Sequence, residues 1–164
     1  MRAVAYDHPD AAQLIARVQL EYTARYGTPD EGPADAAQFV PPTGLFGVAY
    51  VAGEPVAMGG WRYHDGGVAE IKRMYVADGH RGRGLARQLL AWLESTAWAA
   101  GHSRLVLETG LVQPEAIALY RSSGYTDVPA FGYYAGSDLS VYLGKSLSGA
   151  DPSPSGADSC PTGG

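Results

Sequence analysis

The segment from Glu70 to Leu90, EIKRMYVADGHRGRGLARQLL, constrains the fold more than any other part of this 164-residue chain. Its first part is rich in strand-forming residues, and its last part has apolar residues at helical spacing. Between them lie Gly82 and Gly84, where the missing Cβ atoms let backbone N–H groups approach a ligand closely. The unpaired N–H groups at the start of the helix add roughly half a positive charge. The segment therefore predicts a phosphate-binding loop between a strand and a helix.

Two arginines belong to this loop. Arg81 is expected to contact a pyrophosphate, and Arg83 a more peripheral phosphate, through charge-assisted hydrogen bonds. The alternative interpretation is a tight strand-to-helix connection with solvated arginines. The sequence has neither the phosphate loop of nucleoside-triphosphate hydrolases nor the third glycine of the dinucleotide-binding fold, so an ATPase or a dehydrogenase is disfavoured.

The rest of the chain alternates between strand and helix patterns. Strands are expected at 1–6, 45–51, 55–63, 68–77, 104–109, 125–128 and 140–147, and helices at 10–26, 84–100 and 113–123, with a short helix near 34–39. Asp10 and Gln13 resemble an N-cap and its reciprocal partner at the start of the first helix. This order predicts a single mixed α/β (α+β) domain over 1–147. Residues 148–164 offer almost nothing to bury, so we expect a disordered tail.

Composition narrows the class of protein. Twelve Lys plus Arg against seventeen Asp plus Glu give a net charge of −5, which argues against nucleic acid as a partner. The single cysteine, Cys160, excludes an intramolecular disulfide, and the four histidines lack metal-ligand spacing, so no metal is expected. The N-terminus does not resemble a signal peptide, and no apolar run reaches about 18 residues. We therefore expect a cytoplasmic protein without a membrane partner.

Two motifs together carry a family resemblance. Residues 81–86, RGRGLA, match the Arg/Gln-x-x-Gly-x-Gly/Ala signature of the GNAT superfamily of N-acetyltransferases. Residues 113–125 resemble the family's Asn-x-x-Ala-x-x-Leu-Tyr-x-x-x-Gly-Phe pattern, with Gln113 in place of Asn and Tyr125 in place of Phe. The resemblance implies a mixed, mostly antiparallel central sheet flanked by helices, and an acetyltransferase that uses acetyl-CoA. A homodimer is compatible with it.

The resemblance also implies roles for individual residues. The backbone amides of the loop would bind the pyrophosphate of acetyl-CoA, strand groups would pair with the pantetheine arm and the thioester oxygen, and Gln113 would make a cofactor or helix-cap contact. The loop residues are Arg81, Gly82, Arg83, Gly84, Leu85 and Ala86, and the strand residues are Met74, Tyr75 and Val76. Tyr120 would protonate the departing thiolate. The alternative for Tyr120 is a core aromatic whose hydroxyl caps a backbone group.

Acetyl transfer to an amine also needs a base or a desolvated pocket that yields the neutral nitrogen, because an ammonium group has no free lone pair. Glu70 is the candidate, acting directly or through water, because it lies on the strand that enters the phosphate loop, at a position similar to that of the base in many members of the family that the chain resembles. The alternative is that Glu70 forms an ion pair with Lys72, Arg73 or Arg62. On strict alternation, Glu70, Lys72, Met74 and Val76 share one face of the strand unless a bulge intervenes.

The acceptor site is specified only by aromatic residues, which combine apolar bulk with polar tips and attract cations. The candidates are Tyr22, Tyr26, Trp61, Tyr63 and Tyr133, with Phe131 and Tyr134 beside them. The leading function is acetylation of a primary amine of a small molecule, such as an amino acid, a polyamine or an amine antibiotic, by direct attack in a ternary complex. The alternatives are a protein or peptide N-acetyltransferase and a non-catalytic acyl-CoA-binding sensor.

Overall fold

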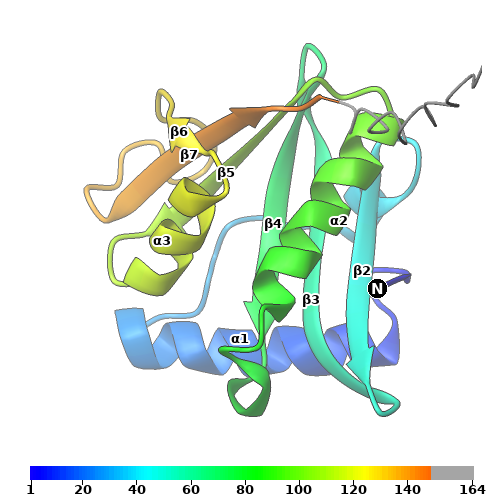
Figure 1. Cartoon of the computed structure of the whole chain (residues 1–164). Helices are drawn as coiled ribbons and strands as arrows, with labels where there is room; N and C mark the ends of the chain where they lie inside the picture. The colour runs from blue at the N-terminus through cyan, green and yellow to red at the C-terminus, as the bar shows by residue number, and fades with distance from the viewer. Residues whose placement is uncertain (149–164) are drawn as a thin grey trace, which may run out of the picture.

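Seven strands form one sheet in the order β1-β2-β3-β4-β5-β7-β6 (Figure 1) in the computed structural model, which describes residues 1–148. The strands are β1 (Arg2–Ala3), β2 (Gly44–Val51), β3 (Glu54–Asp65), β4 (Val68–Val76), β5 (Arg104–Gly110), β6 (Thr126–Asp127) and β7 (Ser140–Ser146). The helices are α1 (Pro9–Tyr26), α2 (Leu85–Ala99) and α3 (Pro114–Ser122), with the short 3-10 helices η1 (Ala36–Phe39) and η2 (Asp78–His80). Among the pairs of described strands, β4 and β5 alone run parallel. The expected mixed, mostly antiparallel sheet is therefore confirmed.

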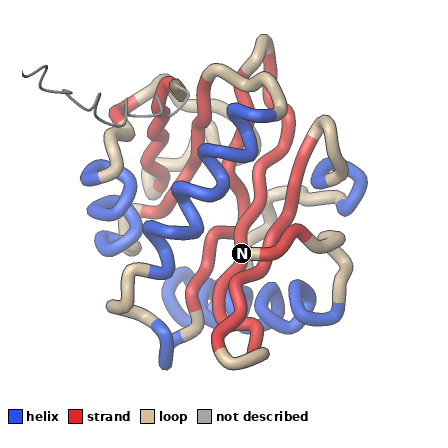
Figure 2. Tube along the Cα trace, turned by 45° about the vertical axis from the view of Figure 1, so that its right-hand side comes forward, coloured by secondary structure: helices blue, strands red, loops and turns tan. Residues whose placement is uncertain are grey.

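Helices cover both faces of this sheet, and each face has its own apolar core. On one face, Leu14 and Val18 of α1 pack in a cluster with Tyr75 of β4. On the other face, Leu89 and Leu93 of α2 pack in a cluster with strand residues. Figure 2 shows α2 and α1 on opposite sides of the strands. The expected amphipathic helices thus account for a three-layer domain. The tail expected over 148–164 lies, from residue 149 on, outside the described residues.

Strands β4 and β5 pair only at one end. Val68 to Glu70 pair with Arg104 to Val106, and the pairing stops there. Beyond this point β5 stays paired with β7 up to Gly110, while β4 stays paired with β3 up to Val76. The C-terminal halves of the two strands therefore separate, as Figure 1 shows, and their backbone groups on the facing edges are free to bind other partners.

A bulge interrupts the alternation of β4. Met58 pairs with Tyr75 and Gly60 with Lys72, so two residues of β4, Arg73 and Met74, lie opposite the single residue between them. Arg73 has a φ of 60°, in the left-handed region that non-glycine residues seldom adopt. Met74 consequently packs on the α2 face, whereas Tyr75 packs on the α1 face. A bulge therefore interrupts β4, so strict alternation does not place Glu70, Lys72, Met74 and Val76 on one face.

The start of the first helix differs from the expected one. Helix α1 begins at Pro9, and its N-cap is His8, whose Nδ1 accepts a hydrogen bond from the Asp10 N–H at 3.1 Å. The prediction of Asp10 as the N-cap was wrong, because proline fits the first helical position, where its fixed φ is favourable and its missing N–H is not needed. The first strand is also shorter than expected, since the chain leaves β2 after Ala3 and turns into this helix.

Candidate active site

A cleft of about 350 Å³ opens where β4 separates from β5. It lies between the end of β4, the glycine-rich loop, the start of α2, and α3. The lining residues are Val18, Glu21, Tyr22, Met74, Tyr75, Val76, His80, Arg81, Gly82, Gly84, Leu85, Ala86, Arg87, Gln113, Glu115, Ala116, Leu119 and Tyr120. Every residue that the sequence indicated for the cofactor lines this cleft except Arg83, which lies outside it. Arg87, which the sequence analysis did not single out, lines it as well.

The glycine-rich loop lines this cleft at Arg81, Gly82 and Gly84. Gly82 and Gly84 have φ values of 73° and 77°, which L side chains adopt only at a cost. Gly84 is the N-cap of α2, and no side chain of the described residues caps that helix end. The uncapped N–H groups and the helix dipole therefore fit a pyrophosphate group. Arg81 holds the loop against β4, because its Nε donates to the Val76 carbonyl at 2.8 Å.

Tyr120 reaches the same cleft from α3. Its side chain is 6% exposed, and its hydroxyl donates to the Met74 sulfur at 3.6 Å. Burial raises the pKa of Tyr120, and the negative charge of Glu108 raises it further. The hydroxyl thus stays protonated at neutral pH, so it is a hydrogen-bond donor within the cleft.

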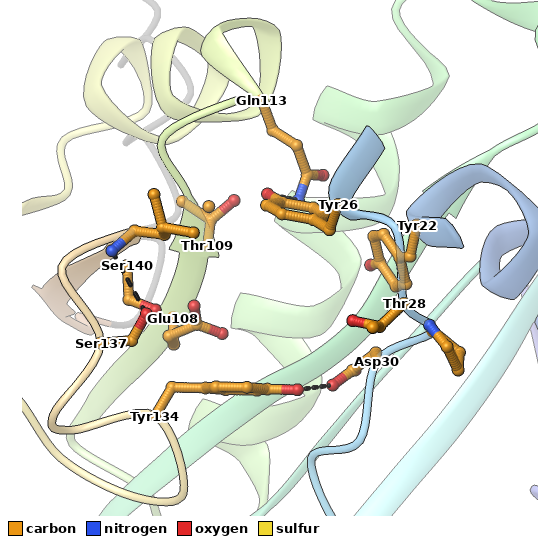
Figure 3. Close-up of a pocket in the computed structure, with 13 residues that line it drawn as sticks. Tyr22, Tyr26, Thr28, Asp30, Glu108, Thr109, Gln113, Tyr134, Ser137 and Ser140 are labelled. Atoms are coloured by element: carbon orange, nitrogen blue, oxygen red, sulfur yellow. Dashed lines mark hydrogen bonds between the residues drawn. The ribbon is translucent and has the colours of Figure 1, made fainter. Parts of the chain in front are cut away.

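A second cavity, of about 230 Å³, adjoins this cleft, because Tyr22 and Gln113 line both. Figure 3 shows its side chains converging from α1, from the end of β5 and from the two loops 27–35 and 131–139. The lining residues are Tyr22, Tyr26, Thr28, Pro29, Asp30, Glu108, Thr109, Gly110, Gln113, Tyr134, Ser137, Leu139 and Ser140. Gln113 donates through Nε2 to the Tyr26 hydroxyl at 2.9 Å, which joins α3 to α1 at the boundary of the two cavities.

Two carboxylates line the second cavity, and their surroundings differ. Asp30 is paired with Arg73, and it accepts hydrogen bonds from the Tyr134 hydroxyl at 2.6 Å and from the Gly32 N–H at 2.8 Å. Glu108 has no ion-pair partner within the described part of the chain. Burial raises the pKa of Glu108, against the opposing effects of a Ser140 hydrogen bond and the Lys72 charge. Glu108 is therefore the carboxylate in this cavity whose charge is not balanced.

Glu70 lies outside both cavities. Its carboxylate is buried in β4, where it contacts Arg62 Nη2 at 2.8 Å and Lys72 Nζ at 3.5 Å. Arg62 in turn donates to the carbonyl of Pro33 at 2.8 Å. This arrangement corresponds to the ion-pair alternative, and the catalytic role of Glu70 stays a prediction.

The aromatic candidates separate into two groups. Tyr22, Tyr26 and Tyr134 line the second cavity. Trp61, Tyr63, Phe131 and Tyr133 line neither cavity: Trp61, for example, is 2% exposed and donates to the Thr96 hydroxyl at 3.0 Å within the core. Glu108 had a signal in the sequence, because it is the lone charged residue of the apolar run LVLET. Asp30 had none, since it lies in a loop whose position depends on the folded chain.

Comparison with known proteins identifies the class of this site. Residues 12–125 match the acetyltransferase (GNAT) family. The chain belongs to the GNAT acetyltransferase family. This GNAT protein is 32% identical over 135 residues to the uncharacterized N-acetyltransferase YjgM of Escherichia coli K12, across 77% of this chain and 81% of that protein.

Two further relatives agree with the family. An IAA acetyltransferase of Azospirillum brasilense is 46% identical over 83 residues, which make up 51% of this chain and 54% of that relative, so the match spans about half of its length. A solved structure from Klebsiella pneumoniae, assigned to the acyl-CoA N-acyltransferases, has a TM-score of 0.77 at 33% identity, across 89% of this chain and 95% of that one. The GNAT acetyltransferase is therefore an enzyme that uses an acyl-CoA, and none of its described helices is long and apolar enough to span a bilayer.

Proposed function

We propose that this GNAT enzyme transfers an acetyl group from acetyl-CoA to a primary amine of a small molecule, by direct attack within a ternary complex. The observation that carries the proposal is the junction of two cavities at Tyr22 and Gln113. Tyr120 lies on one side of this junction and Glu108 on the other. A thioester in the first cavity and an amine in the second would meet between a proton donor and a proton acceptor.

On the donor side, the glycine-rich loop would hold the pyrophosphate, and the free edge of β4 at Met74 to Val76 would hold the pantetheine arm and polarise the thioester carbonyl. The amine nitrogen forms a bond to the carbonyl carbon, and the carbon–sulfur bond then breaks. The thiolate takes its proton from the Tyr120 hydroxyl, which is protonated at neutral pH because its pKa is raised. The second proton, which the nitrogen loses as the amide forms, restores the phenol.

On the acceptor side, the incoming ammonium must lose a proton before it attacks. Glu108 is the better candidate base, because its carboxylate lines the acceptor cavity and has no ion-pair partner among the described residues. Glu70 would have to act through water from outside the cavity, with its oxygens held by Arg62 and Lys72. The proposal therefore assigns the first deprotonation to Glu108 and keeps Glu70 as the alternative.

The acceptor cavity favours a small molecule over a peptide. Its volume of about 230 Å³ lies below the range of roughly 300–1,000 Å³ that is usual for pockets of drug-sized ligands. A peptide would need an open groove in its place. The placement of Tyr120 and Glu108 beside the junction supports turnover over acyl-CoA sensing.

The test is thiol release from acetyl-CoA with a panel of small amines and short peptides. Tyr120→Phe should lower kcat by about 10²- to 10⁴-fold, the usual contribution of a positioned acid. Tyr125→Phe is the matched control, because this neighbouring buried phenol, with its ring centroid 5.7 Å from that of Tyr120, lines neither cavity. Tight acetyl-CoA binding without turnover of any amine would contradict the proposal and favour a sensor.

Glu70→Gln and Glu108→Gln, assayed side by side, separate the two candidate bases. Loss of kcat/KM in Glu108→Gln, with activity retained in Glu70→Gln and with both variants folded, supports the assignment to Glu108. The reverse pattern would return the role to Glu70.

A further inference from the structure

The acceptor cavity has an uneven distribution of charge. Of the 13 residues that line it, two are carboxylates, Asp30 and Glu108, and none is Lys, Arg or His. All of them lie within the part of the chain that the structure describes. The polar groups that remain are phenols, hydroxyls and one amide, so no cation in the wall is ready to pair with an anion on the acceptor.

Three nearby cations are already paired with carboxylates, and the first of them, Arg25, which acts on Tyr26, pairs with Glu21 and Glu115. Arg73 is 9% exposed, pairs with Asp30, and donates a second hydrogen bond to the Gly32 carbonyl at 3.4 Å. Lys72 lies 3.5 Å from Glu70. The charge of Asp30 is thus balanced by Arg73, and its carboxylate also accepts a hydrogen bond from the loop N–H of Gly32. Glu108, in contrast, lines the cavity with a charge that no ion pair among the described residues balances.

This balance discriminates between classes of amine. An ammonium group gains an unpaired carboxylate, Glu108, and three lining tyrosines, Tyr22, Tyr26 and Tyr134, of a residue type whose rings attract cations. A carboxylate on the acceptor would be desolvated beside Glu108 without a cationic partner, which is costly for a partly buried charge. The hydroxyls in the wall can donate hydrogen bonds to it but cannot neutralise it.

We infer that the acceptor is a primary amine without a neighbouring carboxylate, that is, a monoamine or polyamine in place of an α-amino acid. This narrows the proposed function and rests on it. Glu108 is then both the group that attracts the ammonium and the group that removes its proton, and the absence of a cation in the cavity wall is what excludes amino acids.

The experiment uses pairs of acceptors that differ only by the carboxylate: tyramine with tyrosine, cadaverine with lysine, and putrescine with ornithine. Thiol release from acetyl-CoA is measured with the full chain for every member. We expect kcat/KM for the amine to exceed that for its amino acid by at least about tenfold in the pairs that turn over, the loss typical of an unpaired buried charge.

A second measurement changes the charge of the wall. Thr28 lines the cavity and is exposed, so Thr28→Lys adds a cation there without disturbing the core. It should lower the ratio of amine to amino-acid kcat/KM by about tenfold, whereas Thr23→Lys, on the exposed side of α1 and outside the cavity, should leave the ratio unchanged.

Each remaining outcome overturns one of the two proposals. Amino acids used as well as or better than their amines by the wild-type enzyme would overturn the acceptor class and leave acetyl transfer standing. An amine preference that Thr28→Lys does not alter would also overturn it, because the preference would then not arise from the charge of the wall. Absence of thiol release with every acceptor, despite acetyl-CoA binding, would overturn the proposed function itself.

Discussion

The Tyr134 hydroxyl donates a hydrogen bond to Asp30 Oδ1 across 2.6 Å and so joins two loops that lie 104 residues apart in the chain. The Tyr134 oxygen also accepts hydrogen bonds from the backbone N–H groups of Glu31 and Gly32, each at 3.0 Å. Burial, together with the Asp30 carboxylate, raises the pKa of Tyr134 to about 12, so the phenol keeps its proton at neutral pH. One hydroxyl thus holds together the two loops that form the outer wall of the acceptor cavity.

Tyr134→Phe should therefore loosen the acceptor cavity and leave the cofactor cleft intact. We expect KM for the acceptor to rise about tenfold, since three hydrogen bonds to one oxygen are lost, while the Kd for acetyl-CoA stays unchanged. Tyr133→Phe is the matched control, because its side chain is 61% exposed and lines neither cavity. Steady-state kinetics and calorimetric titration with acetyl-CoA decide the matter, and a parallel loss of acetyl-CoA affinity would contradict this role.

The two arginines of the glycine-rich loop should contribute unequally to acetyl-CoA binding. Arg81 lines the cleft and pairs with Glu21 at 2.6 Å and with Asp78 at 2.8 Å, in addition to its contact with β4. Arg83 lies outside the cleft. Arg81→Gln should raise the Kd for acetyl-CoA about tenfold, and Arg83→Gln by less than about threefold, in calorimetric titrations. Equal losses would show that Arg83 contacts the bound cofactor as the sequence predicted.

Glu108 should destabilise the folded enzyme at the pH where it works. The pKa of Glu108 is raised in the folded state, so folding favours the protonated carboxyl group. Its contribution to the free energy of unfolding is therefore complete below the unfolded pKa of 4.5 and is lost as the pH rises through the folded pKa. Glu108→Gln removes the ionised carboxylate and should raise Tm at pH 8 by about 2–4 °C, as expected for roughly 1 kcal/mol in a chain of this size. The gain should shrink at pH 5, and thermal melts at both values test it. The exposed Glu54→Gln should change Tm at neither pH, and a lower Tm for Glu108→Gln at pH 8 would contradict the argument.

Those parts of the fold that repeat a pattern over many residues could be predicted from the sequence. Helix α2 was expected at 84–100 and lies at Leu85–Ala99, because its leucines recur on one face. The glycine-rich loop between β4 and this helix was predicted as well, and its two glycines have positive φ values in the structure. In both cases the determining interactions are local, so the residues that carry the signal are neighbours in the chain.

The features that could not be predicted depend on contacts between distant segments. Nothing in the local sequence of β4 indicates that Arg73 adopts a positive φ. Its side chain pairs with Asp30, 43 residues away, which only the folded chain brings into contact. The sequence named Arg62, Lys72 and Arg73 as possible partners of Glu70, but it could not show that Arg62 and Lys72 are the ones that contact the carboxylate. Which tyrosines line the acceptor cavity also depends on how two loops meet.

Gly110 offers a steric test of the acceptor cavity. A Cβ atom at this position would lie 1.6 Å from the Tyr26 hydroxyl and 2.6 Å from its Cζ atom, so Gly110→Ala must displace the Tyr26 ring and break its hydrogen bond with Gln113. We expect kcat/KM to fall by about 10²-fold, because the loss of the Tyr26–Gln113 contact changes the boundary where the two cavities meet. Overpacking of about 1–3 kcal/mol should also lower Tm by several degrees.

Gly136→Ala and a double variant are the controls for this clash. A Cβ atom at Gly136 meets no heavy atom within 4 Å, so that variant should keep its activity and its Tm. In the Gly110→Ala/Tyr26→Ala protein the clash is gone, and Tm should recover relative to Gly110→Ala while activity stays low, because Tyr26 and its contact with Gln113 are still missing. Full activity in Gly110→Ala would mean that the Tyr26 ring can move without disturbing the acceptor cavity, which would remove Tyr26 from the site.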